Sequence, residues 1–148
     1  MRTEPDSIFE RYLSFYCELA AQQSITFNFQ NAEENLLLWF DSNQLQKVFY
    51  NLLSNAFKYT KPGGTVELHV SSDENEVHIK VIDTGIGISL QHQQTIFDRF
   101  MKVNSFKQGT GLGLTICKTI IKALGGTIGV DSKVGEGTRF WFTLPYNR

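Results

Sequence analysis

Apolar residues recur at the spacing of an α-helix in several separate stretches of the chain. Asp6 or Ser7 can cap the first stretch and Asp41 the second, because short polar side chains accept hydrogen bonds from the first N–H groups of a helix. Proline or glycine closes the second stretch at Pro62-Gly63-Gly64 and the last one at Gly125-Gly126. The pattern predicts helices over residues 8–22, 41–57, 91–100 and 112–124.

Strict alternation of apolar and polar residues marks the strands. Residues 66–70 and 77–81 alternate on either side of a polar turn, which predicts a hairpin that ends at Asp83. Strands are also expected over residues 25–29, 36–39, 127–131 and 138–144. Because the strands occur in pairs with helices between them, we expect an α/β (α+β) two-layer sandwich. Its mixed, mostly antiparallel sheet of about five strands should be covered on one face by about three helices.

Composition limits the possible functions. A chain of 148 residues with 41% hydrophobic content suits one compact domain, and 14 basic against 15 acidic residues give no global field for nucleic acid or an anionic membrane. No apolar run reaches the roughly 18 residues of a membrane span, so we expect a soluble chain without direct membrane contact. Cys17 and Cys117 lie far apart in apolar helical patterns, which predicts reduced core thiols and a reducing compartment.

A polar seam borders the apolar face of the helix that follows Asp41. At about 100° per residue, one flank of this helix carries Gln44, Asn51, Asn55 and Lys58. An asparagine carbonyl is a suitable ligand for Mg²⁺, and a lysine one turn later can neutralise phosphate charge. Taken alone, such a seam is more often a solvated helix edge.

Two glycine-rich segments point to a nucleotide. Residues 83–88 place the Asp83 carboxylate between a strand and two glycines, where it can accept a hydrogen bond from the exocyclic amine of adenine. Residues 109–114 expose backbone N–H groups at a helix start, where anions bind. Each segment alone also fits an ordinary turn. A Rossmann fingerprint is disfavoured because no βαβ unit surrounds the second segment, and no glycine is followed by the Lys-Ser/Thr of a Walker A loop.

Four motifs together resemble the catalytic ATP-binding domain of sensor histidine kinases, within the superfamily of gyrase, heat-shock chaperone and mismatch-repair ATPases. They occupy residues 51–60, 83–88, 96–100 and 109–114, in the order that the family shows. The tail over residues 135–145 is similar to the closing strand of the family. The resemblance implies a Bergerat-type ATP-binding fold over the single domain 1–148, with flexible ends at 1–6 and 146–148 and an ATP lid at 101–111.

The resemblance also implies roles for individual residues. Asn55 would bind Mg²⁺, Asp83 would accept from adenine, and Thr138 would help to hold the base. Lys58 would meet phosphate, Arg99 would contact the γ-phosphate, and both are placed with Asn55 among the catalytic residues. Phe97 and Phe100 would pack under the lid, where Phe106 is either a contact to a partner or a solvent-exposed aromatic. The implied ATP contacts are Asn51, Asn55, Lys58, Tyr59, Asp83, Gly85, Ile86, Gly87, Ile88, Phe100, Gly109, Thr110, Gly111, Leu112, Gly113, Leu114 and Thr138.

Asn51 favours a kinase over a hydrolase. The ATP-hydrolysing members of the superfamily carry a glutamate four residues before the metal-binding asparagine, and an amide cannot act as a general base near neutral pH. Asn51 therefore suits an enzyme that keeps ATP intact until a histidine arrives as nucleophile. A serine kinase, an ATP hydrolase and a nucleotide-sensing module without turnover are the alternative functions.

The acceptor histidine of such kinases is not recognisable in the sequence. His69 and His78 alternate with apolar neighbours on strands and His92 lies in a glutamine-rich segment, so all three are interpreted as structural. The chain is expected to be an excised, monomeric catalytic domain in the cytoplasm. Its partner would be the dimerisation and phosphotransfer hairpin of a parent kinase anchored in the inner membrane, and a response-regulator receiver domain would be an indirect partner.

Overall fold

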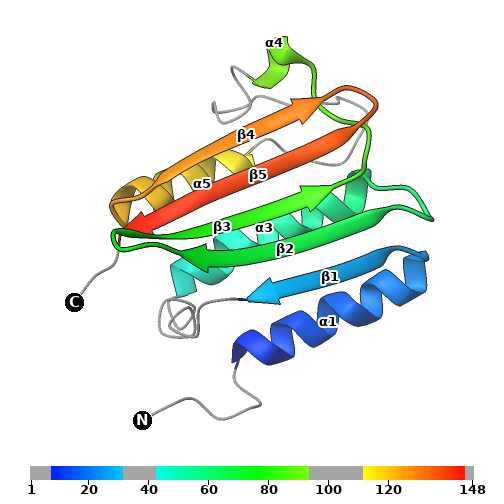
Figure 1. The fold of residues 1–148 in the computed structure, drawn as a ribbon, viewed down its shortest axis with the longest axis horizontal. Coiled ribbons are helices and arrows are strands. Elements are labelled where there is room, and N and C mark those ends of the chain that lie inside the picture. The colour runs from blue at the N-terminus through cyan, green and yellow to red at the C-terminus, as the bar shows by residue number, and fades with distance from the viewer. Residues whose placement is uncertain (1–7, 32–42, 94–111, 146–148) are drawn as a thin grey trace.

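The computed structural model describes residues 8–31, 43–93 and 112–145 (Figure 1). The described helices are α1 (Ile8–Gln23), α3 (Asn43–Tyr59), α4 (Leu90–Gln93) and α5 (Leu112–Ala123). The described strands are β1 (Thr26–Asn31), β2 (Thr65–Ser72), β3 (Glu76–Asp83), β4 (Thr127–Lys133) and β5 (Gly137–Pro145).

The five strands form one mixed sheet in the order β1-β2-β3-β5-β4. β1 runs parallel to β2, and the pairings β2–β3, β3–β5 and β4–β5 are antiparallel. The hairpin β2–β3 confirms the one predicted to end at Asp83, and β4–β5 confirms the closing hairpin. The central pairing of β3 with β5 places Asp83 opposite Thr138, residues that the sequence separates widely.

The helices α3 and α5 cover one face of the sheet, and α1 lies along β1 (Figure 1). Every second residue of β3 is buried toward these helices, because side chains of a strand alternate between its two faces. The core centres on contacts between α3 and the middle of the sheet, such as the edge-to-face pair of Phe49 and Phe142 with ring centroids 5.9 Å apart. The predicted two-layer sandwich is thus confirmed.

The C-terminal end of α3 is tied to the start of the sheet. The hydroxyl of Thr60 donates to the Ala56 carbonyl at 2.7 Å, and the chain then turns through Gly63, whose φ of 91° lies in the left-handed region. The Gly63 N–H donates to the Ser24 carbonyl, and the Gly64 carbonyl accepts from Thr26. These bonds fix where α3 ends relative to the beginnings of β1 and β2.

One sequence prediction is wrong and several fall outside the described residues. Cys117 is fully buried as expected, but Cys17 is exposed, because it lies on the outward side of α1 next to the buried Tyr16. The strand at 36–39, the flexible ends and the lid lie outside the described residues, as does the predicted helix at 91–100 beyond Gln93. Over the residues that the structure describes, no helix combines the length and the apolar character needed to cross a membrane.

Candidate functional site

The candidate site begins where the end of β3 meets the end of α3. Asp83, the last residue of β3, is only 6% exposed although it carries a carboxylate. Gly85 packs so closely on the last turn of α3 that a Cβ at this position would overlap the carbonyl oxygen of Tyr59. Because Gly85 has no side chain, the end of β3 can approach α3 closely, and the polar seam of α3 and the Asp83 carboxylate lie at the same end of the domain.

The Asp83 carboxylate is held in place by backbone groups. Its Oδ1 accepts a hydrogen bond from the Gly85 N–H at 2.8 Å. Burial raises the pKa of Asp83 to about 6, and hydrogen bonds from the backbone of Gly85 and Thr138 counteract part of this rise. Near neutral pH the carboxylate is therefore mostly ionised, oriented, and able to accept a further hydrogen bond.

Ser132 on β4 joins the two sides of this region, and the sequence analysis missed it. Its hydroxyl oxygen accepts from the Ile88 N–H at 2.7 Å and donates to the Gly137 carbonyl at 2.7 Å. It also lies 2.8 Å from Oγ1 of Thr138. Because the single Ser132 proton goes to the Gly137 carbonyl, the Thr138 hydroxyl is the donor in this pair. No local motif marks Ser132, since its importance arises only when β4 pairs with β5.

The loop that follows Asp83 is fastened to the β4–β5 turn by further polar contacts. The Gly135 N–H donates to the Ile86 carbonyl at 2.8 Å, and the Gln93 side-chain amide donates to the carbonyls of Ile88 and Ser132. Gly87 adopts a φ of 79° and leaves no room for a Cβ against the Lys133 carbonyl. Both glycines of the Asp83 segment are thus required by packing, and Ile88 is buried while Ile86 is exposed.

The polar seam of α3 continues the site along the helix. Asn51 and Asn55 are half-buried, and the Asn51 amide donates to the Lys47 carbonyl at 2.8 Å. Within the described part of the chain, no hydrogen bond occupies the Asn55 side chain. Lys58 is exposed, and its Nζ lies 5.9 Å from the ring centroid of Tyr59, a half-buried residue whose pKa is raised by burial.

Lys58 also lines a hollow of about 440 Å³ beside the end of α1, together with Gln22, Gln23 and Ser24. Neither Asn55 nor Asp83 lines this hollow. Lys58 therefore lines a hollow that neither of these site residues reaches, although the Lys58 and Asn55 positions are one helical turn apart on α3.

The remaining predicted contacts are only partly described. Leu112 and Gly113 form the first turn of α5, and Leu114 is buried in the core at 7% exposure. The helix start therefore lies where the sequence predicted it. The predicted site residues Arg99, Phe100, Gly109, Thr110 and Gly111 lie outside the described residues, as do Phe97 and Phe106.

Comparison with known proteins identifies a family and several relatives of this chain. Residues 40–148 match the family described as histidine kinase-, DNA gyrase B- and HSP90-like ATPase. The chain is 42% identical over 127 residues to sensor protein SrrB of Staphylococcus aureus, which covers 82% of this chain. It is 36% identical over 146 residues to histidine kinase P4 of Formosa agariphila, which covers 94% of this chain. The chain spans 21% and 11% of the lengths of these two relatives.

The fold is similar to a solved histidine kinase domain. The catalytic domain of histidine kinase ThkA superposes with a TM-score of 0.76 at 28% sequence identity. The match covers 93% of this chain and 90% of that domain. The chain therefore corresponds to nearly the whole length of that solved catalytic domain.

Proposed function

This chain belongs to the family of histidine kinase-, DNA gyrase B- and HSP90-like ATPases, and from that membership we propose that it is the catalytic domain of a sensor histidine kinase. It would bind Mg²⁺-ATP and transfer the γ-phosphoryl group to a histidine on another domain. The observation that supports this most directly is the buried, backbone-held carboxylate of Asp83 beside the end of α3. A carboxylate that burial makes costly to ionise is typical of a binding site.

Adenine recognition is assigned to Asp83 and Thr138. The oxygen of Asp83 that does not bond to Gly85 would accept from the exocyclic amine of adenine, which guanine cannot offer at that position. Thr138 lies directly across the β3–β5 pairing, and its proton is directed to Ser132, so its oxygen retains capacity to accept. Gly85, Ile86, Gly87 and Ile88 would border the base, and Tyr59 would line the adenine side.

Mg²⁺ and the phosphates are assigned to α3 and the start of α5. Asn55 fits a magnesium ligand, because its half-buried amide has no hydrogen-bond partner among the described residues and an amide carbonyl is a hard oxygen donor. The bound ion would offset charge on the phosphates. Lys58 would turn from its hollow toward the phosphates. The N-terminus of α5 at Leu112 would favour anions.

We assign the phosphate loop and the γ-phosphate contacts to residues outside the described part of the chain. These are Arg99, Phe100, Gly109, Thr110 and Gly111, on the strength of their motifs. Leu112, Gly113 and Leu114 complete the set.

Asn51 favours phosphoryl transfer over ATP hydrolysis. Its amide nitrogen donates to the Lys47 carbonyl, so the side chain is held by its own helix. An amide cannot take a proton from water near neutral pH. Water at this position would therefore be poorly activated, and ATP would persist until the acceptor histidine binds.

The partner and the location follow from the same assignment. The acceptor would be the dimerisation and phosphotransfer hairpin of the parent kinase, which would pass the phosphoryl group on to a response-regulator receiver domain. We propose that this domain is monomeric by itself, contacts neither nucleic acid nor membrane, and works in the cytoplasm beneath a parent anchored in the inner membrane.

Calorimetric titration tests the binding site. Mg²⁺-ATP should bind to one site and GTP should compete poorly. Asp83→Asn should lower the ATP affinity by about 10- to 100-fold, because hydrogen bonds to charged groups contribute about 1.5–3 kcal/mol and the amide would present N–H groups to the adenine amine. Asp131→Asn, an exposed carboxylate of β4, is the matched control. Equal binding of GTP and ATP would contradict the assignment.

Transfer of labelled phosphate tests the activity. With γ-labelled ATP, the chain alone should stay unlabelled, and a separately supplied dimerisation hairpin of a related kinase should acquire an acid-labile, base-stable label typical of phosphohistidine. Label on this chain itself, or an acid-stable product on the hairpin, would overturn the proposal.

A further inference from the structure

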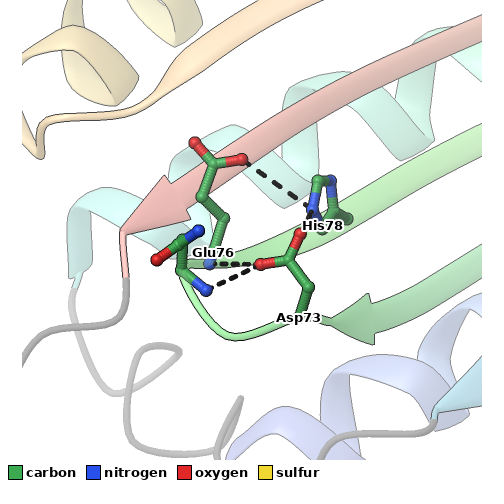
Figure 2. Close-up of polar contacts among 4 residues, drawn as sticks. Asp73, Glu76 and His78 are labelled. Carbon is green, nitrogen blue, oxygen red and sulfur yellow. Dashed lines mark hydrogen bonds and ion pairs between the residues drawn. The ribbon is translucent and has the colours of Figure 1, made fainter.

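Three potential metal ligands converge at the tight turn between β2 and β3, at the opposite end of β3 from Asp83. Figure 2 shows Asp73 and Glu76 directed toward the imidazole of His78. One ligand atom from each of the three residues lies within 4.8 Å of the other two. Oδ2 of Asp73 is 3.0 Å from Nε2 of His78, and Oε1 of Glu76 is 3.8 Å from the same nitrogen.

The turn holds the Asp73 carboxylate in a fixed orientation. Its Oδ1 accepts from the backbone N–H groups of Asn75 and Glu76, both at 2.8 Å (Figure 2). Its Oδ2 is thereby directed at His78. These hydrogen bonds, together with the one from His78, lower the pKa of Asp73 to about 2.

The distances fit a small tetrahedral cation. Metal–ligand bonds of about 2.0–2.2 Å separate two tetrahedral ligand atoms by about 3.4 Å, between the two distances that involve His78. One imidazole nitrogen with two carboxylate oxygens suits zinc and its neighbours, whereas magnesium prefers oxygen ligands and retained water. The two carboxylates also supply negative charge that a divalent cation would neutralise.

An independent feature lies beside His78. Thr143 is opposite His78 in the β3–β5 pairing, and both line a hollow of about 340 Å³ on the sheet face that α3 and α5 do not cover. Thr143 is 8% exposed, and among the described residues its Oγ1 is a buried side-chain oxygen without a hydrogen-bond partner. A water in the fourth position of a metal at His78 would supply such a partner from the hollow.

We propose that Asp73, Glu76 and His78 form a binding site for a divalent transition-metal cation, with Zn²⁺ as the cation that the three donors fit best. His78 supplies Nε2, Asp73 supplies Oδ2, Glu76 supplies Oε1, and water on the Thr143 side completes the coordination. The site is separate from the nucleotide site. Asp83 lies five residues further along β3, about 17 Å at the usual rise, and on its other face.

Zinc titration of the nucleotide-free 148-residue chain tests the site. Calorimetry with ZnCl₂ should give a single saturable site that Mg²⁺ does not fill at equal concentration. Asp73→Asn and His78→Gln should each weaken zinc binding about tenfold or more, because even changes to groups behind the ligands cost about 10- to 100-fold. The asparagine can still accept the two backbone hydrogen bonds of the turn, so Asp73→Asn removes the ligand charge and keeps the local fold.

His69→Gln is the matched control. His69, on β2, also lies 2.8 Å from one carboxylate, that of Glu67, but the residue opposite it in the β2–β3 pairing is the cation Lys80. This variant should bind zinc as the unaltered chain does. Zinc binding that survives both Asp73→Asn and His78→Gln, or that is lost equally in His69→Gln, would overturn the proposal, as would no zinc binding at all. Because nucleotide is absent, none of these outcomes depends on the ATP site.

Discussion

At the scale of single residues, the candidate site depends on a carboxylate that the fold makes costly to ionise. Asp83 is buried between the last turn of α3 and the β3–β5 pairing, and its pKa is raised to about 6 for that reason. Two backbone hydrogen bonds reduce the cost without removing it. We propose that this cost is offset in the bound state, where a ligand would donate an additional hydrogen bond.

The raised pKa of Asp83 predicts a defined dependence of stability on pH. Between about pH 4 and pH 6 the folded chain holds a proton that the unfolded chain has lost, so the free energy of unfolding should fall as pH rises. In Asp83→Asn this contribution disappears. The difference in unfolding free energy between the two proteins should change by roughly 3 kcal/mol across this window and then level off. Urea unfolding of both at pH 4, 5, 6 and 7 measures it, and a constant difference would contradict it.

Ser132 should matter for stability although it bears no catalytic group. Ser132→Ala leaves the Ile88 N–H and the Gly137 carbonyl without their partner and frees the Thr138 hydroxyl. We expect a loss of about 1–3 kcal/mol in unfolding free energy, the usual cost of unpaired buried polar groups. Thermal unfolding measures this loss. Ser71→Ala, an exposed serine of β2, should change stability by less than about 0.5 kcal/mol, and an equal loss in both variants would contradict the role of Ser132.

At the scale of elements, periodicity predicted most of the described helices and strands because they turn one apolar face toward the core. The alternation of Val77, Ile79 and Val81 predicted the second strand of the hairpin, and burial on alternate residues confirms it. Cys17 was misassigned because an apolar pattern does not show which flank of a helix meets the core. The sequence analysis did not predict Ser132 or the Asp73–Glu76–His78 cluster as sites. Their contacts depend on strand pairing and turn geometry, which local sequence patterns do not show.

The contact between the Asp83 loop and α3 gives a prediction for Gly85. Gly85→Ala places a methyl group against the Tyr59 carbonyl, so the loop must move away from the helix end and take its hydrogen bond to Asp83 with it. We expect a stability loss of about 1–3 kcal/mol and an ATP affinity reduced at least as much as in Asp83→Asn. Thermal unfolding and calorimetry measure the two effects.

Gly135→Asn is the control for this variant. Gly135 has a φ of 85° and open space around it, and asparagine tolerates this conformation. It should retain both stability and ATP binding. If Gly85→Ala also retained both, the close packing of the loop on α3 would not be needed for the site.

At the scale of the whole molecule, one core lies between the candidate nucleotide site and the Asp73–Glu76–His78 cluster. Phe142 of β5 meets Phe49 of α3 in its middle, and both side chains are fully buried. In the sheet, β2 pairs with β3 and β4 pairs with β5, whereas β1 joins the sheet through β2. The domain should therefore unfold as one unit.

Phe142→Ala tests whether the domain unfolds as one unit. Removing a buried phenyl ring costs about 3–5 kcal/mol, and the loss should appear equally in far-ultraviolet circular dichroism and in tryptophan fluorescence. Phe15→Ala, at an exposed aromatic of α1, is the control with a small expected effect. Separate transitions for the two probes would show that the sheet and the helical layer unfold independently.

The pairing of β3 with β5 has a consequence for synthesis of the chain on the ribosome. Asp83 emerges early, but its partner Thr138 follows 55 positions later in the numbering, and the two hairpins must dock before the residues meet. Closing such a distant contact is slow compared with forming either hairpin. With the nucleotide site as proposed, a nascent chain should bind nucleotide only after β5 has left the exit tunnel, and cellular ATP should stabilise only molecules that have completed folding.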